Sequence, residues 1–276
     1  GTKMNNEMYE IIKNKKGFIA ALDQSGGSSS KTLKAYGIDE SEYNTEEEMF
    51  DLIHEMRKRV FTSKAFTNEH IIGAILFEKT MLSKVNDEYT ADYLWNEKRI
   101  VSFLKVDKGL AEQANGVKLM KEIPTLAEEL REAREKNVFG TKMRSVIYEA
   151  NEEGIRAVVK QQFEFAKQIC DAGLVPIIEP EVDINAPEKE KCEKILKSEV
   201  KKQLDSWNEE DKIMFKFTIP TVANHYLDLY DYSCVVRIVA LSGGYDVDKA
   251  VEFAITAREA ASALVVLFGL IGDGLD

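Results

Sequence analysis

Seven short apolar runs recur along the chain, and a longer polar or amphipathic stretch follows each of them. They span residues 17–22, 71–77, 101–106, 138–143, 174–178, 213–217 and 235–241. Runs of this length and composition predict buried β-strands, and the stretches between them are long enough for helices. Strands that alternate with helices build a parallel sheet, because each helix carries the chain back across one face of the sheet. The sequence therefore predicts an α/β fold.

The stretches between the runs carry the signals of amphipathic helices. Thr45 with Glu48, and Thr125 with Glu128, have the spacing of a capping box, which predicts that helices begin after the two threonines. Two further stretches have apolar residues at helical spacing and predict helices over residues 155–169 and 188–207.

Two architectures accommodate such a sheet: an open doubly wound sheet and a closed barrel of eight βα units. The length of 276 residues favours the barrel, whose usual size is about 250 residues. A dinucleotide-binding open sheet would carry spaced glycines after its first strand. Here, three serines follow Gly26 and Gly27. We therefore expect one domain, residues 1–276, folded as a (β/α)8 TIM barrel.

The overall charge argues against some classes of partner. The chain has 37 Lys and Arg residues against 48 Asp and Glu residues, a net charge of −11, which disfavours nucleic acid and anionic membranes. Its most apolar stretch, residues 260–272, is too short to span a bilayer. Three cysteines, an odd number, argue against a disulfide framework and fit a reducing compartment. We expect a soluble cytoplasmic protein, and the sequence leaves open whether it is a homo-oligomer.

Charged residues interrupt the apolar runs near their carboxyl ends, where a purely structural strand would keep Val or Ile. These residues are Asp23, Lys105, Asp107, Lys142, Arg144, Glu179, Glu181 and Lys216. Six of them form three pairs two residues apart, and the strand period of two places both members of a pair on one side of the sheet. If that side is the barrel interior, four bases and four acids share the carboxyl-terminal mouth, where such barrels hold their catalytic residues. The alternative is a set of structural ion pairs or strand ends that face water.

A lysine at this mouth has a specific chemical use. Cations crowded in a low-dielectric site lose protons more readily, so we expect clustered lysines to lower one another's pKa. Lys216 is the best candidate nucleophile, because Phe215 and Phe217 predict a strand buried on both faces. An amine of this kind attacks a ketone to form an imine, which withdraws electrons and lets a neighbouring carbon–carbon bond break. Glu179 and Glu181 would then move protons as the first adduct loses water.

Two glycine-containing turns at predicted strand ends suit phosphate binding. Ser242, Gly243 and Gly244 end the seventh run, and glycines let backbone N–H groups approach an anion closely. Ser25, with two glycines after it, follows the first run in the same way. Either segment alone is typical of a plain turn, but beside a lysine cluster we interpret both as anion sites.

A zinc-dependent reaction would need closely placed imidazoles or carboxylates. The chain has only His54, His70 and His225, which we assign to the polar side of a helix, to the start of a strand and to the segment after the sixth run. We therefore expect neither a metal nor another cofactor.

The motifs together resemble the class I (Schiff-base) fructose-1,6-bisphosphate aldolases, in the compact form of some bacteria. The resemblance runs from about Gly17 to Tyr245 and rests on six motifs in register. They are GFIAALDQSGG at 17–27, FLKVDKG at 103–109, GTKMR at 140–144, VPIIEPE at 175–181, FKFT at 215–218 and LSGG at 241–244. The resemblance implies a (β/α)8 barrel that reversibly splits fructose 1,6-bisphosphate into dihydroxyacetone phosphate and glyceraldehyde 3-phosphate in glycolysis and gluconeogenesis.

The resemblance also implies roles for individual residues. Lys216 is similar to the imine-forming lysine, Glu179 to the acid/base that acts on the carbinolamine, and Glu181 to its charge-balancing neighbour. Asp23 resembles the carboxylate that handles the substrate hydroxyl at the bond to be broken, and Lys142 resembles the second active-site lysine. The remaining matches are to substrate-binding groups: Lys105, Arg144, Ser242, Gly243 and Gly244.

The carboxyl-terminal part departs from the family pattern. The family has a phosphate-clamping arginine on its eighth strand, and Arg258 is the residue placed for that role, although it lies closer to Ser242 than the pattern allows. The family's tail tyrosine has no counterpart after Tyr245. We therefore expect a shortened or irregular eighth unit.

Two other functions remain open from the sequence. One is another Schiff-base aldolase or a transaldolase, against which two separated anion sites favour a bisphosphate. The other is a phosphosugar-binding or scaffold barrel with impaired turnover.

Overall fold

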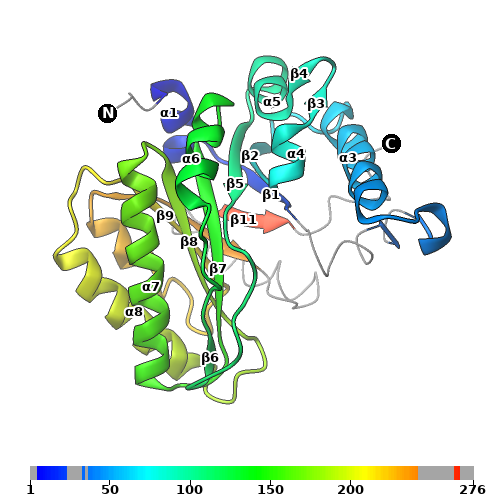
Figure 1. Cartoon of the computed structure of the whole chain (residues 1–276). Coiled ribbons are helices and arrows are strands. Elements are labelled where there is room, and N and C mark those ends of the chain that lie inside the picture. The colour runs from blue at the N-terminus through cyan, green and yellow to red at the C-terminus, as the bar shows by residue number, and fades with distance from the viewer. Residues whose placement is uncertain (1–4, 24–32, 35–36, 242–263, 268–276) are drawn as a thin grey trace.

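The computed structural model describes residues 5–23, 33–34, 37–241 and 264–267 (Figure 1). Within them, eight parallel strands form a ring. In ring order they are β1 (Phe18–Leu22), β2 (Ile71–Leu76), β5 (Val101–Lys105), β7 (Gly140–Ile147), β8 (Val175–Val182), β9 (Ile213–Thr218), β10 (Val235–Leu241) and β11 (Leu264–Leu267). Each strand pairs in parallel with the next, and β11 pairs with β1, so the barrel closes. All seven predicted runs are strands.

The eighth strand is the shortest of the ring, with four residues in β11. Those four residues pair with both β10 and β1, which is sufficient to join the two ends of the sheet. The short β11 agrees with the expected shortened eighth unit. The rest of that unit, residues 242–263 between β10 and β11, lies outside the described residues.

Helices cover the outside of the ring (Figure 1). They are α3 (Glu46–Thr62), α4 (Glu78–Leu82), α5 (Thr90–Lys98), α6 (Leu126–Glu135), α7 (Glu152–Asp171) and α8 (Lys189–Asp205). Smaller elements are the 3₁₀ helices η2 (Glu40–Glu42) and η3 (Leu227–Asp231), the β3 (Lys84–Val85) and β4 (Glu88–Tyr89) hairpin, and β6 (Val117–Lys118), which is antiparallel to β7. None of the helices in the described part of the chain combines the length and the apolar character needed to cross a membrane.

The four predicted helices are present, but their starts differ in detail from the capping-box prediction. The hydroxyl of Thr45 accepts the amide of Glu48 at 3.1 Å, as predicted, whereas the Glu48 carboxylate accepts the amide of Asn44 at 2.8 Å and completes no box. At Thr125 the helix begins as predicted, but the side chain makes no capping hydrogen bond, because the hydroxyl donates to the buried carboxylate of Glu129 at 3.3 Å. A buried carboxylate needs hydrogen-bond donors, and here that need takes the Thr125 hydroxyl away from the helix end.

A short helix, α1 (Asn6–Asn14), closes the amino-terminal end of the barrel. Its buried Met8 and Ile12 belong to the apolar cluster inside the ring. Arg237 of β10 holds this helix, since its guanidinium donates to the carbonyls of Ile12 at 2.8 Å and Lys15 at 2.5 Å. One end of the barrel is therefore sealed, and only the carboxyl-terminal end remains for a site.

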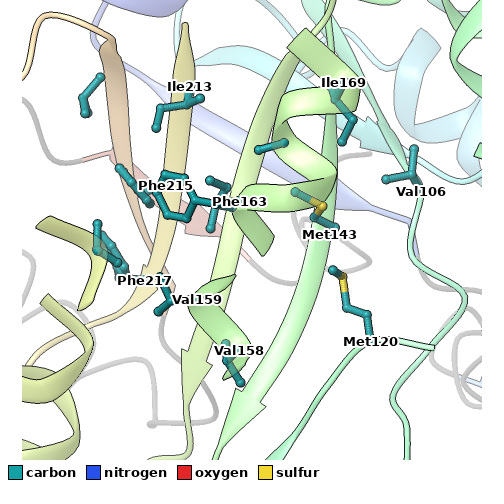
Figure 2. Packing of buried hydrophobic residues seen from close by; sticks show 14 of the residues in the cluster. Val106, Met120, Met143, Val158, Val159, Phe163, Ile169, Ile213, Phe215 and Phe217 are labelled. Atoms are coloured by element: carbon teal, nitrogen blue, oxygen red, sulfur yellow. The ribbon is translucent and has the colours of Figure 1, made fainter. Parts of the chain in front are cut away.

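The strand period separates the inside of the ring from the outside. On β9, Phe215 and Phe217 point outward (Figure 2): Phe215 packs against Phe163 of α7, and Phe217 stacks on Phe215. Met214 belongs to the inner cluster. Lys216 shares the parity of Met214 and therefore points inward. The same inner parity on other strands carries Ile19 and Ala21 before Asp23, Val101 and Phe103 before Lys105, and Val175 and Ile177 before Glu179. An apolar floor therefore lies beneath a layer of charged residues.

Candidate active site

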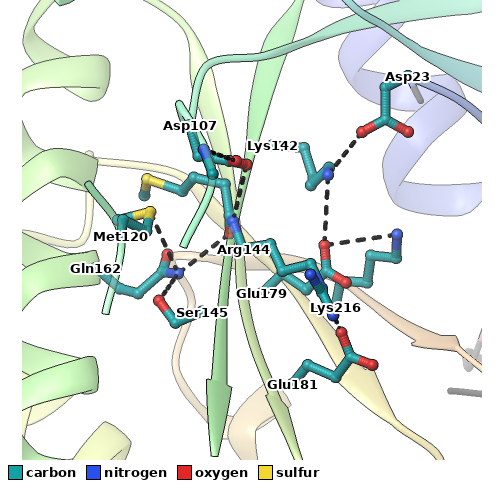
Figure 3. A network of polar contacts seen from close by, with 12 residues as sticks. Asp23, Asp107, Met120, Lys142, Arg144, Ser145, Gln162, Glu179, Glu181 and Lys216 are labelled. Carbon is teal, nitrogen blue, oxygen red and sulfur yellow. Dashed lines mark hydrogen bonds and ion pairs between the residues drawn. The ribbon is translucent and has the colours of Figure 1, made fainter. Parts of the chain in front are cut away.

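Four charged residues from four strands meet in the layer above this floor (Figure 3). The mouth cluster, as we name it, consists of Asp23 just after β1, Lys142 of β7, Glu179 of β8 and Lys216 of β9. None of the four is more than 7% exposed. Buried charges persist in a folded protein only when they compensate one another, so these residues form one electrostatic unit.

Glu179 lies between the two amines of the cluster. Its Oε1 is 3.6 Å from Nζ of Lys216 and 3.7 Å from Nζ of Lys142. Both distances allow strong attraction but exceed a hydrogen bond, and Oε1 has no hydrogen-bond partner among the described residues. Lys142 makes its close contact elsewhere, with Nζ 2.6 Å from Oδ2 of Asp23. The carboxylate nearest to Lys216 is therefore the one that can still accept or donate a proton.

Burial and charge move the pKa values of the two carboxyl groups in opposite directions. Burial raises the pKa of Glu179, and the neighbouring Glu181 adds to this, while Lys216 and Lys142 oppose it. For Asp23, burial is outweighed by Lys142 and Lys216, which lower its pKa to about 2. Two carboxyl groups with separated pKa values suit separate proton-transfer tasks.

The expectation that the lysines lower one another's pKa is right for Lys105 and wrong for Lys142. Burial and the charge of Lys142 lower the pKa of Lys105. Burial also opposes the charge on Lys142, but Asp23 and Glu179 outweigh it and raise the pKa of Lys142. At Lys142 the nearby acids, Asp23 at 2.6 Å and Glu179 at 3.7 Å, decide the outcome.

The rim of the mouth carries a second ion pair. Nε of Arg144 lies 2.5 Å from Oε2 of Glu181, and the Arg144 side chain is 40% exposed. Burial opposes the charge of Arg144, but the contact with Glu181 raises its pKa. Lys105 is half-buried on the neighbouring strand. Arg144 and Lys105 are more exposed than the mouth cluster below them, so a ligand that enters from solvent meets them first.

Comparison with known proteins decides the family. The model of the family described as "Glycolytic: Fructose-bisphosphate aldolase class-I" matches residues 3–219. This chain belongs to the class I fructose-bisphosphate aldolases. It is 59% identical over 249 residues to "Fructose-bisphosphate aldolase class 1" of Clostridium acetobutylicum, which covers 90% of this chain and 84% of the relative. The predicted family is therefore confirmed.

A solved aldolase supports the fold. The structure of fructose-bisphosphate aldolase from Plasmodium falciparum, in complex with TRAP and a small-molecule inhibitor, is similar to this barrel with a TM-score of 0.65. The similarity covers 93% of this chain and 82% of that one at 20% sequence identity. The predicted (β/α)8 fold is thus confirmed by strand pairing and by a structural neighbour.

Ser25, Ser242, Gly243, Gly244 and Arg258 lie outside the described residues. A residue that the sequence analysis missed is Thr218, whose Oγ1 accepts the amide of Val182 at 3.1 Å and ties the end of β9 to the end of β8. Its signal was available, because Thr218 lies two residues after Lys216 and so shares its face of the strand.

The histidines of this aldolase lie apart from the mouth cluster. The prediction for His54 is wrong: it is buried, with Nε2 3.0 Å from the carbonyl of Lys84. His70 is exposed, and Nε2 of His225 lies 2.9 Å from the carbonyl of Glu193. Within the described ranges, no group of three or more His, Cys, Asp or Glu side chains is arranged to hold a metal ion.

Proposed function

We propose that the mouth cluster performs the reversible cleavage of fructose 1,6-bisphosphate to dihydroxyacetone phosphate and glyceraldehyde 3-phosphate, with Lys216 as the imine-forming residue. Membership of the class I aldolase family supports the reaction. The position of Glu179 supports the residue assignment, because its Oε1 lies 3.6 Å from the Lys216 amine within the mouth cluster.

Imine formation uses Lys216 and Glu179. The unprotonated amine of Lys216 attacks the keto carbon and gives a carbinolamine. Its hydroxyl leaves as water after Glu179 donates a proton, and the lone pair of nitrogen forms the C=N bond. Burial, which raises the pKa of Glu179, favours the protonated form that this step needs.

Bond cleavage uses Asp23. Its carboxylate accepts the proton of the substrate hydroxyl next to the bond that breaks, and the aldehyde product leaves. The electron pair of the broken bond moves to the imine nitrogen and leaves an enamine. Protonation of the enamine carbon and hydrolysis of the imine then release the second product and restore the lysine. Asp23 is paired with Lys142 at 2.6 Å, and its pKa of about 2 keeps it ionised and ready to accept the proton.

The phosphate groups of the substrate are assigned to the rim. Lys105 and Arg144 supply positive charge beside the mouth cluster, and guanidinium and ammonium groups both bind phosphate. The motif matches extend this proposal to Ser25, Ser242, Gly243, Gly244 and Arg258. Two separate sets of anion-binding groups along the sequence favour a ligand with two phosphates.

The chain as a whole supports a cytoplasmic role as one catalytic domain. Its three cysteines, Cys170, Cys192 and Cys234, are free thiols, and burial raises the pKa of each of them. Its net charge of −11 supports a small-molecule substrate rather than nucleic acid or an anionic membrane. A homo-oligomer is compatible with this proposal and is tested by the mass in solution.

Borohydride reduction in the presence of dihydroxyacetone phosphate tests the imine. Reduction should add the mass of the ketone-derived group to the peptide that contains Lys216, as located by mass spectrometry. Lys142 serves as an internal control, because its contact with Asp23 keeps it protonated. An unmodified Lys216 under saturating ligand would reject the Schiff-base route and favour a barrel that binds phosphosugars without cleaving them.

A further inference from the structure

We propose that Asp107 is a positioning residue of the active site: its buried carboxylate joins the carboxyl ends of β5 and β7 and so fixes Lys142 and Arg144 for the substrate. The inference rests on the proposed function of the mouth cluster. It assigns to Asp107 a task that neither its charge nor its strand parity predicts.

The carboxylate of Asp107 is held by two backbone amides. Asp107 lies two residues beyond the end of β5 and is 7% exposed. Its Oδ2 accepts the amide of Arg144 at 3.1 Å (Figure 3), and its Oδ1 accepts the amide of Gly109 at 3.1 Å. Hydrogen bonds to an ionised acceptor are about twice as strong as neutral ones, so this side chain has a fixed orientation.

The contact between the Asp107 side chain and the Arg144 amide extends the pairing of β5 and β7 beyond their backbone hydrogen bonds. The ladder between β5 and β7 ends with Lys105 opposite Lys142, followed by the amide of Val106 donating to the carbonyl of Lys142 at 3.0 Å. In a continuing parallel ladder, the amide of Arg144 would next donate to the carbonyl of Val106. The side chain of Asp107 takes that amide instead. The two strands therefore remain joined where the chain after β5 turns away.

This join fixes the backbone from Lys142 to Arg144. The carbonyl of Lys142 is held by Val106, and the amide two residues later is held by Asp107. Lys142 and Arg144 thereby keep the backbone twist that directs both side chains inward, one to Asp23 and the other to Glu181. A residue that fixes the backbone of two substrate-contacting groups changes their placement without touching the substrate itself.

The charge of Asp107 acts on the same neighbours. The groups that face Lys142 are Asp23 from β1, Glu179 from β8, and Lys105 and Asp107 from β5. Although burial opposes the charge on Lys142, Asp107 joins Asp23 and Glu179 in raising its pKa. Asp107 likewise opposes the lowering of the pKa of Lys105 that burial and Lys142 cause. Both effects keep the two lysines cationic for an anionic ligand.

The Asp107→Asn variant tests this role, because it keeps the size of the side chain and loses the charge and one of the two acceptor oxygens. We expect the KM for fructose 1,6-bisphosphate to rise about tenfold, since displaced groups cost binding and rate. Borohydride trapping of dihydroxyacetone phosphate on Lys216 should persist, because the carboxylate of Asp107 accepts from the amides of Gly109 and Arg144 and not from β9. Hydrogen exchange in the peptide that contains the Arg144 amide should become faster.

Asp183→Asn is the matched control. Asp183 also follows a strand end and accepts an amide two residues ahead, that of Asn185 at 2.8 Å, but this contact does not join neighbouring strands. We expect its KM and kcat to remain near those of the wild type. The proposal is overturned if Asp107→Asn keeps the wild-type KM, or if it loses trapping and cleavage to the same extent. If the wild type is not trapped, the imine itself is rejected. The KM of Asp107→Asn and the hydrogen exchange of the Arg144 amide would then still test the positioning role of Asp107.

Discussion

Two buried clusters, each with acidic and basic side chains, flank the end of β9. They differ in how well their polar atoms are supplied with hydrogen-bond partners. The α8 pair, as we name it, consists of Lys189 and Glu193, whose Nζ and Oε2 lie 2.7 Å apart. Lys189 also donates to the carbonyl of Ile219 at 2.8 Å, and Glu193 accepts the amide of Thr221 at 3.0 Å. In the mouth cluster, by contrast, Glu179 lies 3.6 Å or more from both amines.

The difference indicates that the α8 pair stabilises the fold, whereas the mouth cluster is suited to proton transfer. In the α8 pair the charges hold each other and the chain after β9 at hydrogen-bond distances, so its charges are compensated and its geometry is fixed. In the mouth cluster the carboxyl group between two amines keeps an oxygen that can exchange a proton with a ligand. Both clusters are buried, and so burial alone does not identify the one to which we assign catalysis.

The largest effect is expected from replacing Lys216, the lysine of the mouth cluster that we assign to the imine. Lys216→Met should reduce kcat by a factor on the order of 10⁴ or more, because no other group supplies the covalent step. Its stability should change less than that of Lys189→Met below, because Glu179 keeps Lys142 at 3.7 Å and its raised pKa lets it hold a proton in place of the lost cation. Steady-state cleavage rates and thermal unfolding measure the two effects. A variant that unfolds, or one with wild-type activity, contradicts the assignment.

The acid of each cluster gives a second contrast. Glu179→Gln keeps the shape of the side chain and cannot transfer a proton, so kcat should fall about a thousandfold. Its matched control is Glu193→Gln, which removes the negative charge of the α8 pair. This change should lower the stability, while the folded enzyme keeps its rate. Rates per folded molecule, with the folded fraction taken from circular dichroism, decide this. Equal losses of rate in the two variants would remove the distinction between the clusters.

The lysine of the α8 pair tests the structural half of the comparison. Lys189→Met leaves Glu193 buried without its cation and should lower the free energy of unfolding by about 3 kcal/mol. Lys194→Met, at an exposed lysine 3.7 Å from Glu190 on the same helix, should change it little. Urea unfolding measures both variants. Similar small changes would mean that the chain after β9 does not depend on the α8 pair.

The smallest expected effect is the dependence of the free energy of unfolding on acidic pH. The pKa of Asp23 is about 2 in the folded protein against a usual 3.8, so ionised Asp23 stabilises the fold by about 2 kcal/mol. Because the folded value is the lower one, this contribution is fully present above pH 4 and is lost as the pH falls toward 2. Asparagine does not titrate, so the difference in unfolding free energy between wild type and Asp23→Asn should shrink over this range. A constant difference would show that the Asp23–Lys142 contact does not set the acid sensitivity.

Features that depend on nearby residues were predictable from the sequence. The strands were visible because their apolar runs are continuous, and the inward direction of Asp23, Lys105, Lys142, Glu179 and Lys216 follows from a period of two. Features that depend on distant partners were not. Thr125 serves Glu129 instead of its helix end, and His54 is buried against a carbonyl 30 residues away. In both cases a tertiary contact overrode the local signal.

What the sequence by itself determined was seven of the eight barrel strands, the parity that turns the charges to one side, and motifs specific enough to indicate the family. Only the tertiary structure decided which charges pair: Lys142 with Asp23, Arg144 with Glu181, and Glu179 within reach of two amines at once. The physical reason is that electrostatic interaction depends on distances and burial between strands far apart in the chain. Strand periodicity directs a side chain inward but does not fix what lies opposite it.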